Sequence, residues 1–265
     1  MYHVPVLSIV FMLISCICAF AMPVVLFIYF RTKKKAEILP FFVGCGVMFL
    51  FSFVIESTIH QVVFRSPAGA AIQGNILLYA LYGGLMAGLF EECGRFIAFR
   101  TVLKRYLPQD PNALMYGAGH GGIEAIMLLG IAMINNMIYS ILLNLGQSSV
   151  LTGPLPPELA QQVEGTFEKL ATLPPGTFLL GLLERVLALT LQIALSVIVW
   201  FAAKRKERRM LLPAAIFIHF MVDAVAVIIA EKLPALAVEG VIAVMDVPAV
   251  LFAYLLWKAE KKMAE

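Results

Sequence analysis

Two adjacent glutamates and an arginine, Glu91, Glu92 and Arg95, interrupt an apolar run of the chain that extends over residues 76–99. A soluble helix would turn these charges towards water, but this run has no polar face. Neighbouring carboxylates suit general acid–base chemistry, because different surroundings can give the two groups different roles. The four-residue spacing of Glu91 and Arg95 predicts an ion pair on one helix face. A structural ion pair between helices is the alternative interpretation.

Two histidine–carboxylate pairs with the same spacing occur in other apolar runs, at His120 and Glu124 and at His219 and Asp223. This spacing places both members of a pair on one face of a helix. An imidazole can donate a hydrogen bond to an oxyanion, and a carboxylate can fix its orientation. Glycines at 117, 119, 121 and 122 surround the first histidine, where a helix or a substrate backbone can approach closely. Polar contacts between helices would use the same residues, and that interpretation stays open.

Two histidines with carboxylates are also a potential zinc site. The chain contains no H-E-x-x-H motif, and no cysteine lies at ligand spacing. The four cysteines, at positions 16, 18, 45 and 93, lie in apolar runs and are expected to be buried thiols rather than a disulfide framework. We therefore expect a site that requires no cofactor, with zinc as an alternative that no standard motif supports.

The composition indicates the elements that must position these residues. Hydrophobic residues make up 61% of the chain and charged residues 14%, whereas soluble domains are nearer half apolar and a quarter charged. Seven apolar runs have the ~20 residues that cross a bilayer. They cover residues 5–30, 38–63, 73–99, 113–145, 177–203, 211–231 and 236–257. The sequence predicts an all-α, polytopic membrane protein with one integral domain, residues 1–265, and a short amphipathic surface helix at residues 158–170.

Basic residues are distributed unequally between alternate loops. Fifteen lie in the segments that follow the first, third, fifth and seventh runs, and three, Arg65, Lys169 and Lys232, lie in the others. Lysine and arginine are concentrated in the cytoplasmic loops of membrane proteins. The N-terminus is therefore predicted to be outside and the C-terminus cytoplasmic. The regular alternation also supports a count of seven spans.

The polar residues of three runs lie at similar depth. At a rise of about 1.5 Å per residue, Glu91, His120 and His219 are about 12–15 Å from the cytoplasmic ends of their runs. Glu56 and His60 fall near the external end of the second run, where side chains can reach the interface, and we interpret them as structural. The sequence predicts one buried polar site in the cytoplasmic half of the membrane.

The order of these motifs resembles the glutamate-type intramembrane protease superfamily, which includes the type II CAAX prenyl endopeptidases and the PrsW proteases. The shared elements are Glu91-Glu92-x-x-Arg95, a histidine in the next span, and His219-x-x-x-Asp223 two spans later. The bacterial YhfC family is the most similar, through Gly119-His120-Gly121-Gly122-x-Glu124. The likeness covers residues 75–230, which would be the catalytic core. Seven spans with an external N-terminus also resemble the scaffold subunit of gamma-secretase.

The resemblance implies hydrolysis of a peptide bond in a membrane-embedded or membrane-associated polypeptide, at a bacterial cell membrane and without a nucleic-acid partner. Glu91 or Glu92 would be the general base that activates water. His120 and His219 would hold water or stabilise the tetrahedral oxyanion, with support from Asp223. Such a mechanism needs no metal. The catalytic set would be Glu91, Glu92, Arg95, His120, Glu124, His219 and Asp223.

Two other functions fit the same composition. A non-catalytic scaffold would keep the motifs as a binding core and should tolerate Glu91→Gln without losing its partner. A proton-coupled transporter would use the buried carboxylates and histidines as a proton relay. Inverted repeats and broken helices would favour the transporter, and the sequence shows neither.

Overall fold

The structure, a computed structural model, describes residues 2–264, and within these residues it contains helices and no strand. Seven helical segments are long and apolar enough to cross a membrane. They are Val6–Lys33, Leu39–Phe64, Ile76–Arg100, Pro111–Asn144, Thr177–Lys204, Lys206–Ala230 and Ala235–Met263. The prediction of an all-α polytopic fold with seven spans is therefore confirmed, and the sidedness of the termini stays a prediction.

Two spans are interrupted by π-helical segments. The second span consists of α2 (Leu39–Met48), the π-helical η1 (Phe49–Glu56) and α3 (Ser57–Phe64). The fourth consists of α6 (Pro111–Ala125), the π-helical η3 (Ile126–Gly130) and α7 (Ile131–Asn144). Segments of this kind occur often at functional sites, because the extra residue in the turn changes which side chains face inward.

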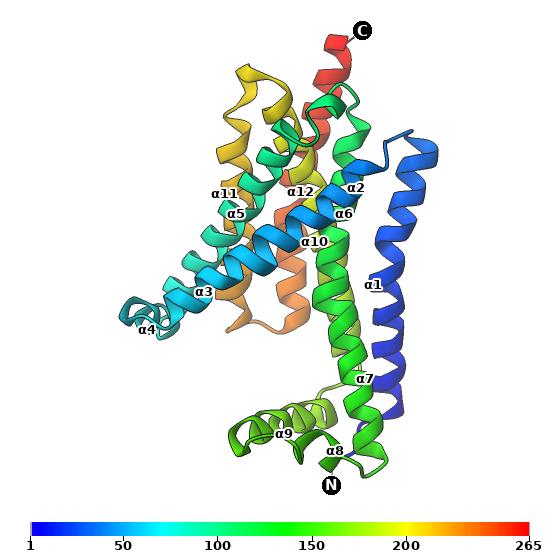
Figure 1. The fold of residues 1–265 in the computed structure, drawn as a ribbon, viewed down its shortest axis with the longest axis vertical. Helices are drawn as coiled ribbons and strands as arrows, with labels where there is room; N and C mark the ends of the chain where they lie inside the picture. The colour runs from blue at the N-terminus through cyan, green and yellow to red at the C-terminus, as the bar shows by residue number, and fades with distance from the viewer. Residues whose placement is uncertain (1, 265) are drawn as a thin grey trace. The chain divides into compact units, whose positions relative to one another are not determined.

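Each of the other spans contains one α-helix, and the sixth also includes the preceding 3-10 turn η4 (Lys206–Arg208) (Figure 1). They are α1 (Val6–Lys33), α5 (Ile76–Arg100), α10 (Thr177–Lys204), α11 (Leu211–Ala230) and α12 (Ala235–Ala264). The connections contain α4 (Pro67–Gln73), α8 (Ser149–Thr152), α9 (Pro157–Thr172) and the 3-10 turns η2 (Lys104–Tyr106) and η4 (Lys206–Arg208). Helix α9 confirms the predicted amphipathic helix, since it buries Phe167 and Leu170 and exposes most of its polar residues.

The chain forms two compact units, and α1 and α10 each contribute residues to both. The first unit consists of residues 1–22 and 125–185. Its apolar core includes Met12, Leu129 and Phe167. A hydrogen bond from Ser15 Oγ to the carbonyl oxygen of Phe178, 2.8 Å long, ties α1 to the start of α10 within this unit.

The second unit consists of residues 23–124 and 186–265 and contains every residue of the predicted site. Its core includes three edge-to-face aromatic rings, with Phe99 4.6 Å from Tyr116 and 4.9 Å from Trp200 between ring centroids. These rings join α5, α6 and α10 close to one end of each helix. Apolar packing thereby fixes α5 and α6, which carry five of the seven predicted site residues, against α10.

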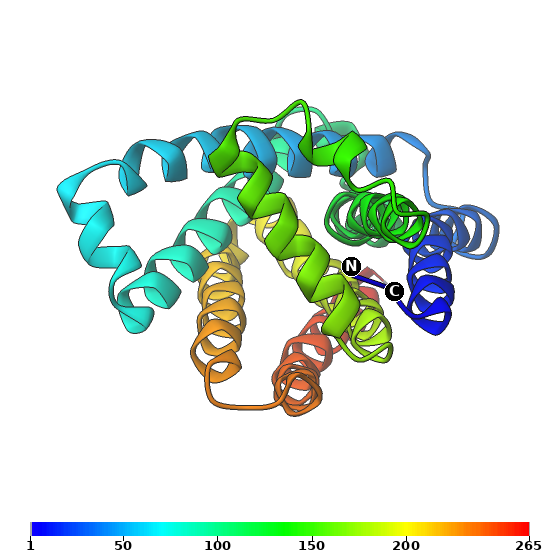
Figure 2. The ribbon, with the colours of Figure 1, turned by 90° about the horizontal axis from the view of Figure 1, so that it is seen from below.

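Close packing of α5 against α11 depends on two glycines of α5 (Figures 1 and 2). A Cβ atom added at Gly84 would lie 2.7 Å from the carbonyl oxygen of Phe220, and one at Gly88 would lie 2.8 Å from that of Ile216. Small residues four positions apart let two membrane helices approach closely in this way. The contact brings the α5 carboxylates to the α11 histidine.

Candidate functional site

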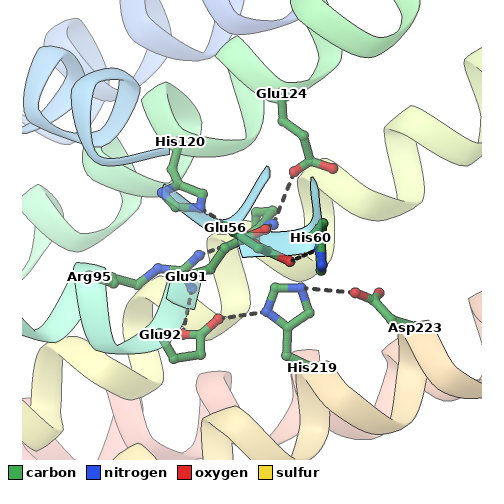
Figure 3. A network of polar contacts seen from close by, with 10 residues as sticks. Glu56, His60, Glu91, Glu92, Arg95, His120, Glu124, His219 and Asp223 are labelled. Carbon is green, nitrogen blue, oxygen red and sulfur yellow. Dashed lines mark hydrogen bonds and ion pairs between the residues drawn. The ribbon is translucent and has the colours of Figure 1, made fainter. Parts of the chain in front are cut away.

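A network of buried polar side chains lies between α5, α6, α10 and α11 of the second unit (Figure 3). The structure brings all seven residues predicted from the sequence into it: Glu91, Glu92 and Arg95 from α5, His120 and Glu124 from α6, and His219 and Asp223 from α11. All of them except Asp223 are buried. Charges at this depth in a membrane protein face other protein groups and often mark function.

Glu92 uses both of its oxygens. Its Oε2 accepts a hydrogen bond from Arg95 Nη1 at 3.0 Å, and its Oε1 lies 2.9 Å from His219 Nδ1. Arg95 thus pairs with the glutamate three residues away, and the prediction that its partner is Glu91 was wrong. Residues three and four positions apart are both neighbours on a helix, so spacing alone does not choose between them.

Glu91 is bonded through one oxygen. Its Oε2 lies 3.0 Å from His120 Nε2 and accepts a hydrogen bond from Gln192 Nε2 at 2.8 Å. No residue within the range 2–264 donates to Oε1, and this side chain is 6% exposed, whereas that of Glu92 is 0% exposed. The two glutamates therefore differ: both oxygens of Glu92 contact protein groups, whereas one oxygen of Glu91 has no hydrogen-bond donor among the described residues.

Gln192 of α10 connects the parts of the network. Its Nε2 donates to Glu91 and, at 3.0 Å, to Glu124 Oε2, while its Oε1 accepts from Arg95 Nη2. An amide carries both donors and an acceptor, so it can bridge carboxylates and a guanidinium. Sequence reasoning missed Gln192 because it is uncharged. The available signal was a single amide in the apolar run 177–203.

The two histidines each keep a nitrogen without a short protein contact. His219 Nε2 lies 3.5 Å from Asp223 Oδ2, which exceeds the usual hydrogen-bond length of about 2.7–3.2 Å. His120 Nδ1 is buried and has no hydrogen-bond partner in the described part of the chain, and its ring stacks on Tyr116 at 5.7 Å. Each ring is held by a glutamate on one side and keeps its other nitrogen for another group.

Glu56 and His60 belong to the same network of polar contacts, and Glu56 is buried rather than reaching the interface as the sequence suggested. Glu56 is 5% exposed, and its Oε1 lies 3.1 Å from His60 Nε2. His60 Nδ1 in turn lies 2.9 Å from the hydroxyl of Tyr82. Figure 3 shows Glu56 and His60 beside Glu91 and His219. The π-helical η1 ends at Glu56, and no pattern in the sequence reports that change of turn.

The glycines around the α6 histidine are occupied by helix packing. A Cβ atom at Gly119 would lie 2.0 Å from the carbonyl oxygen of Phe41 in α2, and one at Gly121 would lie 2.9 Å from Gln192 Cβ in α10. The sequence suggested that a helix or a substrate backbone could approach at these glycines. The structure shows the approach of other helices. This packing accompanies the contact of both His120 and Gln192 with Oε2 of Glu91.

The arrangement of donors does not fit a zinc ion. Zinc sites take three or four ligands at about 2 Å from the metal. Residues 2–264 contain no group of three or more histidine, cysteine, aspartate and glutamate side chains placed to hold a metal. The guanidinium of Arg95 lies within the same network, and its positive charge opposes a second cation there. We therefore derive no chemical step through a metal.

Comparison with known proteins identifies relatives over almost the whole chain. Residues 18–253 match the family described as "YhfC intramembrane metalloprotease". The chain is 33% identical over 260 residues to the "uncharacterized membrane protein YhfC" of Bacillus subtilis (strain 168), which covers 96% of this chain and 97% of that protein. No solved structure matches significantly. The network of glutamates and histidines thus lies in a multi-pass membrane protein that belongs to the YhfC family of intramembrane proteases.

Proposed function

We propose that this protein is a glutamate-type intramembrane endopeptidase in which Glu91 activates water for attack on a peptide bond. The observation that carries the proposal is the difference between the two glutamates. Both oxygens of Glu92 contact Arg95 or His219, whereas Oε1 of Glu91 makes no hydrogen bond within residues 2–264. A general base needs a lone pair within reach of the proton that it removes. Glu91 meets this condition, and Glu92 does not.

In this mechanism Oε1 of Glu91 removes a proton from water while the water oxygen bonds to the carbonyl carbon of the substrate. The carbonyl oxygen takes up the electron pair and becomes an oxyanion. Protonated His219, held at Nδ1 by Glu92, donates from Nε2 to that oxyanion. The proton then passes from Glu91 to the leaving nitrogen as the C–N bond breaks. The products are a carboxylic acid and an amine.

The other members of the network position these two groups. His120 and Gln192 hold Oε2 of Glu91, which fixes the direction of Oε1. Arg95 balances the charge of Glu92, which fixes the ring of His219. Because the reacting groups lie within membrane-spanning helices, we propose a membrane-embedded or membrane-associated polypeptide as the substrate.

Substitution of the glutamates one at a time tests the proposal. Glu91→Gln keeps the shape but removes the base, so turnover of a membrane peptide should fall by about 10²–10⁴ while the unfolding temperature stays near the parental value. Glu92→Gln should lower turnover and also the unfolding temperature, because buried Arg95 loses its carboxylate. Parental turnover in Glu91→Gln would reject the proposed base. No cleavage of any membrane peptide by the parental protein would favour a non-catalytic scaffold.

Metal dependence requires its own experiment, since the family description names a metalloprotease. The purified protein should cleave the same peptide at an unchanged rate after treatment with a chelator, because Glu91 activates water directly. Metal content should be measured on the same sample. Activity that disappears with the chelator and returns with stoichiometric zinc would reject the metal-free mechanism.

A further inference from the structure

A hollow of about 300 Å³ opens between α3, α5 and α11 and reaches the polar network at His60 and at Asp223. The side chain of Asp223 is 39% exposed, whereas those of Glu91, Glu92 and His219 are at most 6% exposed. The hollow is therefore a place where the buried network meets space that another molecule can occupy. Its volume lies at the lower end of the range of about 300–1,000 Å³ for small-ligand sites, which suits one side chain rather than a whole helix.

Aromatic rings form one wall of this hollow. The ring of Phe64 is stacked on His60 at 5.6 Å and on Tyr79 at 6.0 Å between centroids. Tyr82 lies edge-on to Phe64 at 5.6 Å and to His60 at 5.3 Å. Ring pairs at these separations attract one another and hold their geometry.

Polar contacts behind this wall help to fix its orientation. The Tyr82 hydroxyl bonds to His60, and His60 bonds to Glu56, which is itself buried beside the network. The wall is thus a rigid surface of ring faces and edges, built into α3 and α5 before any ligand arrives. A rigid surface of this kind favours a further ring that can lie edge-on or stacked against it.

We propose that this hollow is a substrate subsite that receives an aromatic side chain close to the scissile bond. This inference rests on the proposed peptidase function. It adds that an aromatic side chain of the substrate determines which peptide bond reaches Glu91. The aromatic wall supplies contacts for a phenyl or phenol ring. The opening at Asp223 places the neighbouring peptide bond next to His219 and the glutamates.

Gly83 provides a way to fill the hollow without disturbing the helices. It lines the hollow, and a Cβ atom added there would meet no atom within 4 Å. Gly83→Leu therefore occupies the space with little strain. Gly46 of α2 is a matched control, because a Cβ atom there is equally unobstructed and Gly46 does not line the hollow.

The experiment measures binding rather than turnover. Full-length protein carrying Glu91→Gln, which should slow cleavage by about 10²–10⁴, is placed in lipid nanodiscs. Two fluorescent Leu/Ala peptides of about 24 residues, long enough to cross the bilayer, differ by a single Phe or Ala. The Phe peptide should bind up to about tenfold more tightly, as ring contacts allow. Added Gly83→Leu should abolish the difference, and added Gly46→Leu should preserve it.

Equal binding of the two peptides, or a preference for Phe that survives Gly83→Leu, would overturn the subsite. Loss of the preference in Gly46→Leu as well would also overturn it, because the effect would not be specific to the hollow. Failure of the peptidase proposal gives a different result: protein with Glu91 restored would bind the Phe peptide preferentially and leave it uncleaved.

Discussion

At the residue scale, the network depends on an uncharged side chain. Gln192 contacts a guanidinium and two carboxylates, so it satisfies three buried groups that have few alternatives. A buried polar group that loses its partner costs about 1–3 kcal/mol. Gln192 therefore both positions the side chains of the site and stabilises the packing of the helices that carry them.

We expect Gln192→Leu to lower both the unfolding temperature and the turnover, because Glu91 and Arg95 each lose a hydrogen bond. Thermal unfolding and peptide cleavage should be measured on the same preparation. Ser196→Ala, one turn along α10, is the control, since among residues 2–264 Ser196 Oγ donates only to the carbonyl oxygen of Gln192 in its own helix. Gln192→Leu that behaves like Ser196→Ala would contradict the central role of the amide.

Two buried carboxylates outside the network should respond to substitution in opposite ways. Asp246 is 4% exposed, and neither of its oxygens has a hydrogen-bond partner within residues 2–264. Glu260 is equally buried but accepts hydrogen bonds from Arg205 Nε at 2.9 and 3.1 Å. Asp246→Leu should raise the unfolding temperature, because an unpartnered polar group is unfavourable in an apolar interior. Glu260→Leu should lower it, and the reverse order would reject this account.

At the scale of elements, hydropathy predicted where the seven spans lie but did not predict the π-helical segments within them. Each span needs ~20 apolar residues, and this requirement is visible in composition alone. The π-helical segments η1 and η3 leave composition and length unchanged, so the sequence did not predict them. The burial of Glu56 at the end of η1 escaped prediction for that reason.

The seven site residues were placed together by a similar argument, from spacing and depth. A four-residue interval defines a shared helix face, and a common depth defines a level in the membrane. Neither argument states which partner a side chain chooses, so Arg95 was assigned to the wrong glutamate. Gln192 was missed because an amide carries no charge that would be costly in lipid. The catalytic roles of these residues stay predictions.

The contact of α5 with α11 gives a test of how helix spacing controls the site. Gly88→Ala places a methyl group against the Ile216 carbonyl and should separate the helices, lowering the unfolding temperature and the turnover. Gly83→Ala on the same helix is the control, because its methyl group meets no atom within 4 Å. We expect the control to keep or slightly raise stability, since alanine favours helix over glycine by about 1 kcal/mol. Equal unfolding temperatures for the two variants would contradict the role of Gly88.

At the scale of the whole molecule, the orientation in the membrane follows from charge. With the four native cysteines replaced, a cysteine at position 34 should react with an impermeant thiol reagent only after intact cells are opened. A cysteine at position 232 should react from outside. Labelling of position 34 in intact cells would reverse the topology that the fifteen-to-three distribution of basic residues predicts.

The predicted catalytic core, residues 75–230, and the compact units divide the chain differently. The unit that contains the network begins at residue 23 and so includes Glu56 and His60, whereas residues 125–185 belong to the other unit. Sequence motifs define the core by where charged residues begin and end. The compact unit is instead defined by which helices pack together. It therefore also includes α2, which carries no charged residue. The prediction of one domain over residues 1–265 is not tested by this division.

The pairing of Arg95 with Glu92 has a consequence for biogenesis. Synthesis proceeds from the N-terminus, so α5 enters the bilayer before α10 and α11 have been made. A charged residue at the centre of an inserting helix costs about 2.5–3.5 kcal/mol. Arg95 and Glu92 lie three residues apart and can meet as soon as the nascent helix forms. Helix α5 therefore carries a counter-ion for Arg95 in its own sequence as it enters the membrane. The partners of Glu91, His120 and Gln192, lie in helices that are translated later.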